Sequence, residues 1–209
     1  MLSRIEYAAY LQYSPRGTSE ISIRSRQGRD VIKAGRKDMI ADVAKRIGDD
    51  VKGGLFNDWF DGEVTLVPVP GSAPLKDKDA LWVPKLICEA LLAEGVGNEI
   101  STCLARISAV KKSAYSAPGE RPSVQEHYDS FEVTMTLIPP KPRIVLVDDF
   151  VTKGRTLTEA CSRVSEAYEH CEVRAFTVFR TRGFDEVDPI IFPFEGHIAF
   201  NGYDANRGD

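Results

Sequence analysis

Residues 143–157 read RIVLVDDFVTKGRTL and constrain the fold more than any other part of the chain. Residues 144–147 form a continuous apolar run, which is typical of a strand covered on both faces of a parallel sheet. Asp148 and Asp149 follow this run directly. Because successive strand side chains point to opposite faces, we do not expect the two acids to lie side by side on one solvated surface. The segment therefore predicts a buried parallel strand that delivers two carboxylates to one edge of a sheet.

The turn after these acids has the chemistry of a phosphate site. Thr152, Gly154 and Thr156 supply hydroxyls and a steric gap where a helix begins, and the free N–H groups and dipole of a helix start favour a phosphate. Two like charges about 4 Å apart repel by roughly 4 kcal/mol at an effective dielectric constant near 20, so hydroxyl donors, a cation or water must offset that repulsion. A sugar phosphate would satisfy both halves of the segment. The alternative is a strand, an Asp-rich turn and a helix capped by Thr156 and Glu159.

The stretch VLVDDFVTKGRT resembles the fingerprint of type I phosphoribosyltransferases, which bind 5-phosphoribosyl-1-pyrophosphate. The resemblance covers hydrophobic residues, two acids and a Thr-x-Gly-x-Thr phosphate loop in the expected order. It implies that Asp148 and Asp149 contact the 2′ and 3′ hydroxyls of the ribose. It also implies that the 5′-phosphate is cradled by Val151, Thr152, Lys153, Gly154, Arg155 and Thr156.

Composition limits the class of protein. A chain of 209 residues with 43% hydrophobic and 28% charged residues suits one globular domain. We expect residues 1–60 to form an N-terminal hairpin and helix, 61–180 the core and 181–209 a tail. A formal charge of −4 and a pI near 5.5 give no overall attraction to nucleic acid or to an anionic membrane.

The four cysteines and the N-terminal residues favour a cytoplasmic protein. Cys88, Cys103, Cys161 and Cys171 form no C-x-x-C pair, so neither a zinc ribbon nor a disulfide framework is indicated. The sequence MLSRIEYAAY has no signal-peptide core, and no apolar run downstream is long enough to cross a membrane. We therefore expect reduced thiols and no membrane association.

Strand and helix patterns alternate along the chain and predict an α/β fold with a mainly parallel sheet flanked by helices. Residues 5–13 and 20–26 are expected to form an N-terminal β-hairpin around the turn at 14–17. Helices are expected at 37–51, 79–94 and 156–168, and further strands at 64–69, 101–106, 131–137, 144–147 and 173–179. The resemblance implies that this is the type I phosphoribosyltransferase fold.

A second anion loop is expected after the strand at 64–69. Pro70, Gly71 and Ser72 could expose backbone N–H groups and a hydroxyl to an anion, although a proline-rich turn that merely ends a strand would look similar. In type I phosphoribosyltransferases the loop after the first core strand holds pyrophosphate. The Val-Pro-Val-Pro sequence of residues 67–70 resembles the ComF-like branch of that family.

Residues 106–128 show no sustained apolar period and are expected to form a mobile loop. The resemblance implies that such a loop closes over pyrophosphate and excludes water. The candidates to reach pyrophosphate are Arg106, Lys111, Lys112 and Arg121. Arg106, Arg121 and the Ser-Phe-Glu-Val of residues 130–133 resemble the ComF-like pattern, but the Gln and Asn of that branch are not clearly reproduced. A solvated surface loop is the alternative for each basic residue.

The resemblance implies a magnesium-dependent enzyme that transfers a phosphoribosyl group to a small-molecule nitrogen acceptor and releases pyrophosphate. Mg²⁺ would bridge the pyrophosphate and the ribose hydroxyls with few protein ligands. Asp149 is also a candidate general base. The acceptor is not indicated, because the aromatic tail at 192–209 could bind a heterocycle or simply dock on the core. A homodimer is compatible with this function.

Two other functions stay open. One is a non-catalytic sensor that binds 5-phosphoribosyl-1-pyrophosphate, although the chain shows no appended DNA-binding domain. The other is a phosphate-binding α/β enzyme with unrelated chemistry, such as a phosphatase, which no Walker-type loop or cluster of metal ligands supports.

Overall fold

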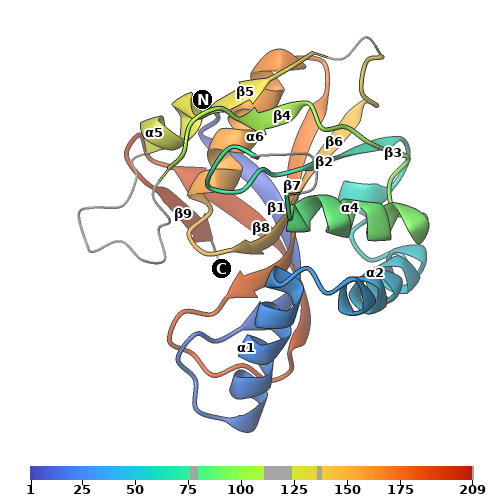
Figure 1. The fold of residues 1–209 in the computed structure, drawn as a ribbon, viewed down its shortest axis with the longest axis vertical. Helices are drawn as coiled ribbons and strands as arrows, with labels where there is room; N and C mark the ends of the chain where they lie inside the picture. The colour runs from blue at the N-terminus through green and yellow to red at the C-terminus, as the bar shows by residue number, and fades with distance from the viewer. Residues whose placement is uncertain (76–79, 111–123, 136–137, 209) are drawn as a thin grey trace.

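A seven-stranded sheet runs through the middle of the molecule in the computed structural model, which describes residues 1–75, 80–110, 124–135 and 138–208 (Figure 1). In spatial order the strands are β3 (Glu99–Ile100), β2 (Val64–Pro68), β6 (Arg143–Val151), β7 (Glu172–Thr181), β1 (Arg4–Tyr13), β8 (Ile191–Phe200) and β9 (Ala205–Gly208). Neighbouring strands from β3 to β1 are parallel, and β8 and β9 extend the sheet in antiparallel fashion. The mainly parallel α/β sheet that the sequence predicted is confirmed.

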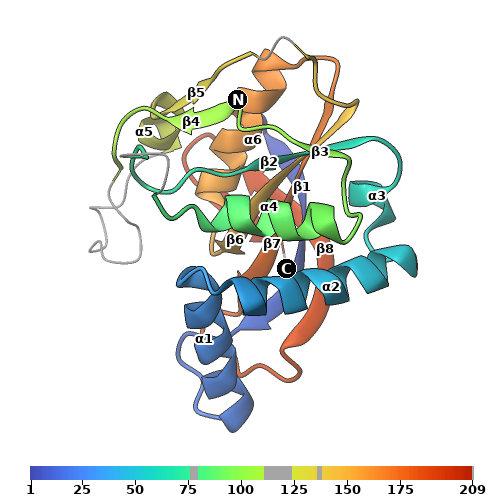
Figure 2. The ribbon, with the colours of Figure 1, turned by 45° about the vertical axis from the view of Figure 1, so that its right-hand side comes forward.

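Helices cover both faces of this sheet (Figures 1 and 2). One face carries α1 (Glu20–Lys33), α2 (Lys37–Lys52), α3 (Asn57–Phe60) and α4 (Val83–Ala93). Figure 2 shows α2 and α4 side by side in front of the sheet. The other face carries α6 (Arg155–Ala167), α5 (Val124–Asp129) and a small antiparallel sheet of β4 (Leu104–Arg106) and β5 (Phe131–Val133). Each face of the main sheet therefore has its own hydrophobic core.

The strand β6 is buried on both faces, as its apolar run predicted. Ile144 and Leu146 pack into the core beneath α6, and Val145 and Val147 pack into the core beneath α2 and α4. All four side chains are 0% exposed. Burying each one contributes roughly 1.5–3 kcal/mol, so β6 is held firmly in the centre of the sheet.

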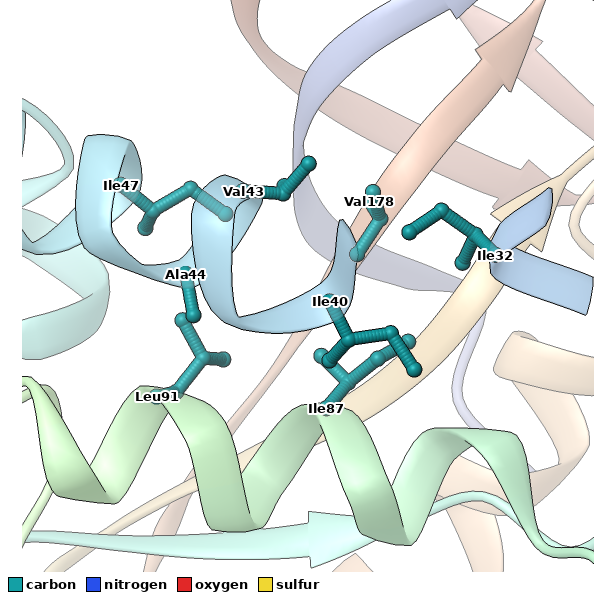
Figure 3. Close-up of a pocket in the computed structure, with 8 residues that line it drawn as sticks. All are labelled: Ile32, Ile40, Val43, Ala44, Ile47, Ile87, Leu91 and Val178. Atoms are coloured by element: carbon teal, nitrogen blue, oxygen red, sulfur yellow. The ribbon is translucent and has the colours of Figure 1, made fainter. Parts of the chain in front are cut away.

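A small cavity lies in the core between α1, α2, α4 and β7 (Figure 3). Its volume is about 10 Å³, which is roughly the room that one water molecule needs. The lining side chains are all apolar: Ile32, Ile40, Val43, Ala44, Ile47, Ile87, Leu91 and Val178. Because they offer a ligand no hydrogen-bonding group, we assign this cavity to the core and not to a binding site.

The predicted N-terminal β-hairpin is wrong. Its first strand exists as β1, but residues 20–26 begin α1. The hydroxyl of Ser19 accepts a hydrogen bond from the N–H of Ser22 (3.2 Å) and caps the helix. The buried side of α1 includes Ser22 and Ser25, so its inner face is polar at those positions. That is why residues 20–26 gave a strand-like alternation instead of a helical apolar stripe.

Two other predictions about strands need correction. The strands predicted at 101–106 and 131–137 contain β4 and β5, which pair with each other outside the main sheet. The region predicted as a tail, 181–209, contributes β8 and β9 to the main sheet. The β4–β5 and β1–β8 pairings join segments that are distant in sequence, and the local pattern of neither segment reveals its partner.

Glu186 holds the start of α1 against the β7–β8 connection. Its carboxylate accepts hydrogen bonds from the Thr18 N–H (2.6 Å) and from the hydroxyls of Ser19 (2.7 Å) and Ser22 (2.6 Å). These donors lower the pKa of Glu186 to about 2. A lowered carboxyl pKa contributes stability above the unfolded value near 4.5, and that stability is lost as the pH falls toward 2.

We therefore expect Glu186→Gln to lower the Tm at pH 7 and to have no effect on it near pH 2. Thermal unfolding followed by circular dichroism at pH 7, 4 and 2 would measure the difference. Glu89→Gln is a suitable control, because Glu89 makes an exposed 3.7 Å ion pair with Lys85, and such surface pairs contribute little to stability. A Tm difference that is the same at all three pH values would contradict this role for Glu186.

Candidate functional site

The acid pair lies at a topological switch point of the sheet. The chain leaves β2 toward β3 at one edge, whereas it leaves β6 toward β7 in the opposite direction. In open α/β sheets, ligands bind outside the carboxyl ends of strands at such a point. Pairing of β2 with β6 ends at Pro68 and Val147, and β6 continues to Val151 alongside β7. Asp148 and Asp149 therefore project beyond the end of β2.

Side-chain alternation along β6 breaks at these acids. Val145 and Val147 face the α2 and α4 side, so strict alternation would place Phe150 on the α6 side. Phe150 instead faces the α2 and α4 side, and Val151 faces the α6 side. The register between β1 and β8 also shifts at the same level of the sheet, between Ala9 and Leu11. Such irregularities bend strands and redirect side chains. The Asp148 carboxyl accepts a hydrogen bond from the Asp149 N–H (2.8 Å), and the Asp149 carboxyl accepts one from the Phe150 N–H (2.9 Å).

The environment of the pair raises the pKa of both acids. Burial is the largest cause for Asp148, followed by the negative charge of Asp149. Burial also raises the pKa of Asp149, and the nearby ammonium of Lys33 opposes that rise. Lys33 comes from the last turn of α1 and lies 3.9 Å from the centre of the Phe150 ring. A pair of this kind takes up a proton readily, and hydroxyl donors or a cation would favour its ionised form.

The turn predicted to bind phosphate, residues 151–156, follows the pair without a break. Gly154 has a φ of +93° and is the N-cap of α6. A Cβ at this position would overlap the Ile198 side chain of β8. No side-chain hydrogen bond caps this helix in the described part of the chain, so the capping box of Thr156 and Glu159, which was the alternative to a phosphate site, does not form. The first N–H groups of α6 thus remain suited to an anion.

The second predicted loop lies beside the same edge and is tied to the small sheet. Arg106 is 5% exposed; its Nε donates to the Gly71 carbonyl (2.5 Å) and its Nη1 to the Ser130 hydroxyl. Its guanidinium also lies 3.9 Å from the centre of the Phe131 ring. The Val110 N–H donates to the Ser72 carbonyl (2.8 Å). These contacts hold the Gly71 loop in place.

The predicted site residues differ in accessibility. Thr152, Lys153 and Gly71 are exposed, Ser72, Arg155 and Thr156 are partly exposed, and Pro70 and Val151 are buried. Val151 offers only its backbone to a ligand, because its side chain is in the core. Lys111, Lys112 and Arg121 lie outside the described residues.

Three residues near the site were not predicted as site residues from the sequence. Asp204, in the β8–β9 turn, pairs with Lys153 (3.0 Å) and Arg155 (2.6 Å). Lys33 lies near the acid pair. Glu159 of α6 is 0% exposed, and among the residues that the structure describes neither of its carboxyl oxygens has a hydrogen-bond partner. The nearby Arg106 has its pKa lowered to about 10 by burial, while the charges of Glu159 and Asp148 oppose this. Only Glu159 carried a local signal, because the alternative of a capping box already included it.

In the described part of the chain, histidine, cysteine and acidic side chains nowhere form a group of three that could hold a metal ion. The acid pair supplies the hard oxygen ligands that Mg²⁺ prefers. Mg²⁺ commonly binds through one or two carboxylates together with phosphates of a substrate. The donor set therefore fits Mg²⁺ held mainly by ligand oxygens. No helix in the described ranges has both the length and the apolar character that crossing a bilayer requires.

Comparison with solved structures finds phosphoribosyltransferases. A hypoxanthine phosphoribosyltransferase from Staphylococcus aureus has 10% identity and a TM-score of 0.37, over 73% of this chain and 70% of that chain. An enzyme of the same name from Trypanosoma cruzi has 20% identity and a TM-score of 0.33, over 76% and 69%. An adenine phosphoribosyltransferase has 19% identity and a TM-score of 0.34, over 70% and 71%. No protein-family model and no curated protein matches the chain.

Both the left-handed backbone at position 154 and the adjacent Ile198 side chain require a glycine there. We expect Gly154→Ala to lower the free energy of unfolding by roughly 1–3 kcal/mol for the left-handed backbone and by a further 1–3 kcal/mol for the overlap with Ile198. Gly62→Ala is the matched control, because Gly62 has a φ of +82° but open space around its Cβ position. Denaturant unfolding measures both variants. Equal losses would show that the contact with Ile198 is unimportant.

Glu159 should make stability depend on pH. Burial raises its pKa to about 9, so the folded protein holds a proton that the unfolded chain loses near pH 4.5. This acid therefore destabilises the fold increasingly as the pH rises from 4.5 to 9, by at most roughly 1.4 kcal/mol per pH unit. We expect Glu159→Gln to match the wild type at pH 5 and to be more stable at pH 8. Denaturant unfolding at both values measures this, and a variant that is less stable at pH 8 would contradict it.

Proposed function

We propose that the protein is a magnesium-dependent phosphoribosyltransferase. It binds 5-phosphoribosyl-1-pyrophosphate, transfers the phosphoribosyl group to a nitrogen acceptor and releases pyrophosphate. One observation carries this proposal: a pair of neighbouring acids and a left-handed glycine turn stand on one strand–helix junction at the switch point of the sheet. The Val-Pro-Val-Pro sequence before Gly71 favours the ComF-like branch of this family.

Asp148 and Asp149 would bind the ribose. Carboxylates accept hydrogen bonds from vicinal hydroxyls, and those donors relieve the repulsion within the pair. The transition state has positive charge on the ribose ring. Two carboxylates held in place beside the ring stabilise that charge more than they stabilise the neutral substrate.

The two loops would bind the two phosphate ends of the donor. The turn from Thr152 to Thr156 offers hydroxyls and the first N–H groups of α6 to the 5′-phosphate. The loop at Gly71 and Ser72 offers backbone N–H groups to pyrophosphate, and Arg106 fixes this loop through the Gly71 carbonyl. Since one loop follows β2 and the other follows β6, the neighbouring strands set the spacing between the two anion sites.

Bound Mg²⁺ would supply positive charge that neutralises the pyrophosphate as it leaves. The protein's share in this would be the acid pair, which would orient the ribose hydroxyls. Arg106 adds a buried positive charge near Asp148. The acceptor is a small molecule with a nucleophilic nitrogen, for which Asp149 is the candidate general base.

The acid pair can be tested directly. We expect Asp148→Asn/Asp149→Asn to lower affinity for 5-phosphoribosyl-1-pyrophosphate with Mg²⁺ by at least ~100-fold, because each lost charged hydrogen bond contributes roughly 1.5–3 kcal/mol. Titration calorimetry measures the affinity. Asp42→Asn/Asp58→Asn removes the same charge from exposed positions on α2 and α3 and should bind like the wild type.

Pyrophosphate release distinguishes an enzyme from a sensor. Wild-type protein, donor and Mg²⁺ would be mixed with a pool of nitrogen heterocycles and amines, and pyrophosphate would be measured over time. Release that requires an acceptor would support transfer. Tight binding without release would favour a sensor of the donor. Undiminished binding by the Asp148→Asn/Asp149→Asn variant would refute the site itself.

A further inference from the structure

Asp204, in the turn between β8 and β9, forms ion pairs with two residues of the proposed phosphate loop, residues 151–156. Asp204 Oδ2 lies 3.0 Å from Lys153 Nζ, and Asp204 Oδ1 lies 2.6 Å from Arg155 Nε. These two cations flank Gly154, so a single carboxylate holds both sides of the left-handed residue. The side chains of Asp204 and Arg155 are only 17% and 18% exposed. This pairing is therefore better shielded from water than an ordinary surface ion pair.

Two further contacts join the same hairpin to the loop. The side chain of Ile198, in β8, fills the space where Gly154 lacks a Cβ. Arg207, in β9, donates from Nη1 to the Val151 carbonyl (3.3 Å) and from Nη2 to the Thr181 carbonyl (2.5 Å). Figure 1 shows β9 beside the end of α6 at which this loop enters the helix. Residues 198–207 thus contact the loop at its first residue, at its glycine and at both cations.

The turn that carries Asp204 is itself ordered. The side-chain oxygen of Asn201 accepts hydrogen bonds from the N–H groups of Tyr203 (3.0 Å) and Asp204 (2.8 Å). The ion pair with Arg155 is the largest cause that lowers the pKa of Asp204, to about 2. Asp204 is therefore ionised throughout the neutral range and fixed in direction.

We propose that Asp204 is a positioning residue, which holds Lys153 and Arg155 so that the loop keeps its phosphate-binding shape before a ligand arrives. The chemistry of the ligand, a phosphorylated pentose, rests on the proposed function. The hairpin β8–β9 is then a brace for the phosphate site.

If Asp204 acted only through its charge, removing that charge would change the affinity for phosphate in the opposite direction. A carboxylate near a phosphate site repels the ligand and competes for its cations, so removing that charge should tighten binding. A brace predicts weaker binding, because the freed loop must be ordered when the ligand binds. The direction of the change in affinity therefore separates the two roles.

The experiment uses Asp204→Asn in the full-length protein and two readouts. Hydrogen exchange of the backbone amides at 152–156, without ligand, reports loop order. We expect exchange to become roughly 10-fold faster. Calorimetry with ribose 5-phosphate reports the phosphate end alone, and we expect a roughly 10-fold loss of affinity. Affinity for inorganic pyrophosphate should stay unchanged.

Two further variants separate positioning from charge and from folding. Asn201→Ala keeps every charge but loosens the turn, and it should shift both readouts in the same direction as Asp204→Asn. Asp185→Asn, which removes an acid ion-paired with Arg182 (3.4 Å), is the matched control and should leave both unchanged.

The role is overturned if Asp204→Asn leaves amide exchange unaltered or binds ribose 5-phosphate as tightly as the wild type, or more tightly. That failure differs from failure of the proposed function, in which the wild-type protein itself would not bind ribose 5-phosphate.

Discussion

The structure depends on the burial of β6 on both faces while its carboxyl end stays beyond the neighbouring strand. Apolar residues 144–147 are fixed by two separate cores, so the strand cannot shift its register without exposing one set of side chains. Because β2 stops at Pro68, the next residues of β6 leave the cores and face the switch point. The same strand therefore anchors the sheet and presents the acids.

The buried strand and the turn after it could be predicted from the sequence, because the features that define them lie within a short stretch of the chain. Residues 144–156 combine an apolar run, two acids and a glycine turn, and each feature has its own physical meaning at short range. The same reasoning failed for α1, where buried serines replaced the apolar stripe and Glu186, far along the chain, completes the N-terminal cap. It failed again for β8 and β9, because the alternation of an antiparallel strand does not encode which strand it pairs with.

The position of the acids was only half predictable. The sequence indicated where the pair leaves the strand, but regular alternation predicted separate faces for Asp148 and Asp149. Alternation breaks near the acids instead, because Phe150 packs on the same side of the sheet as Val147. The role of Asp204 could not be predicted from the sequence for a similar reason, because Asp204 lies about fifty residues after the loop that it contacts. The fold of β8 and β9 brings it next to Lys153 and Arg155.

Arg106 and Glu159 are two buried ionisable residues near the candidate site. Burial lowers the pKa of Arg106 to about 10 and raises that of Glu159 to about 9. At neutral pH the arginine therefore stays charged, while the glutamate holds a proton. The donors of Arg106 are directed at the Gly71 carbonyl and the Ser130 hydroxyl. Arg106 thereby ties the Gly71 loop, which follows β2, to the small sheet of β4 and β5, whereas Asp204 ties the turn that follows β6 to the β8–β9 hairpin.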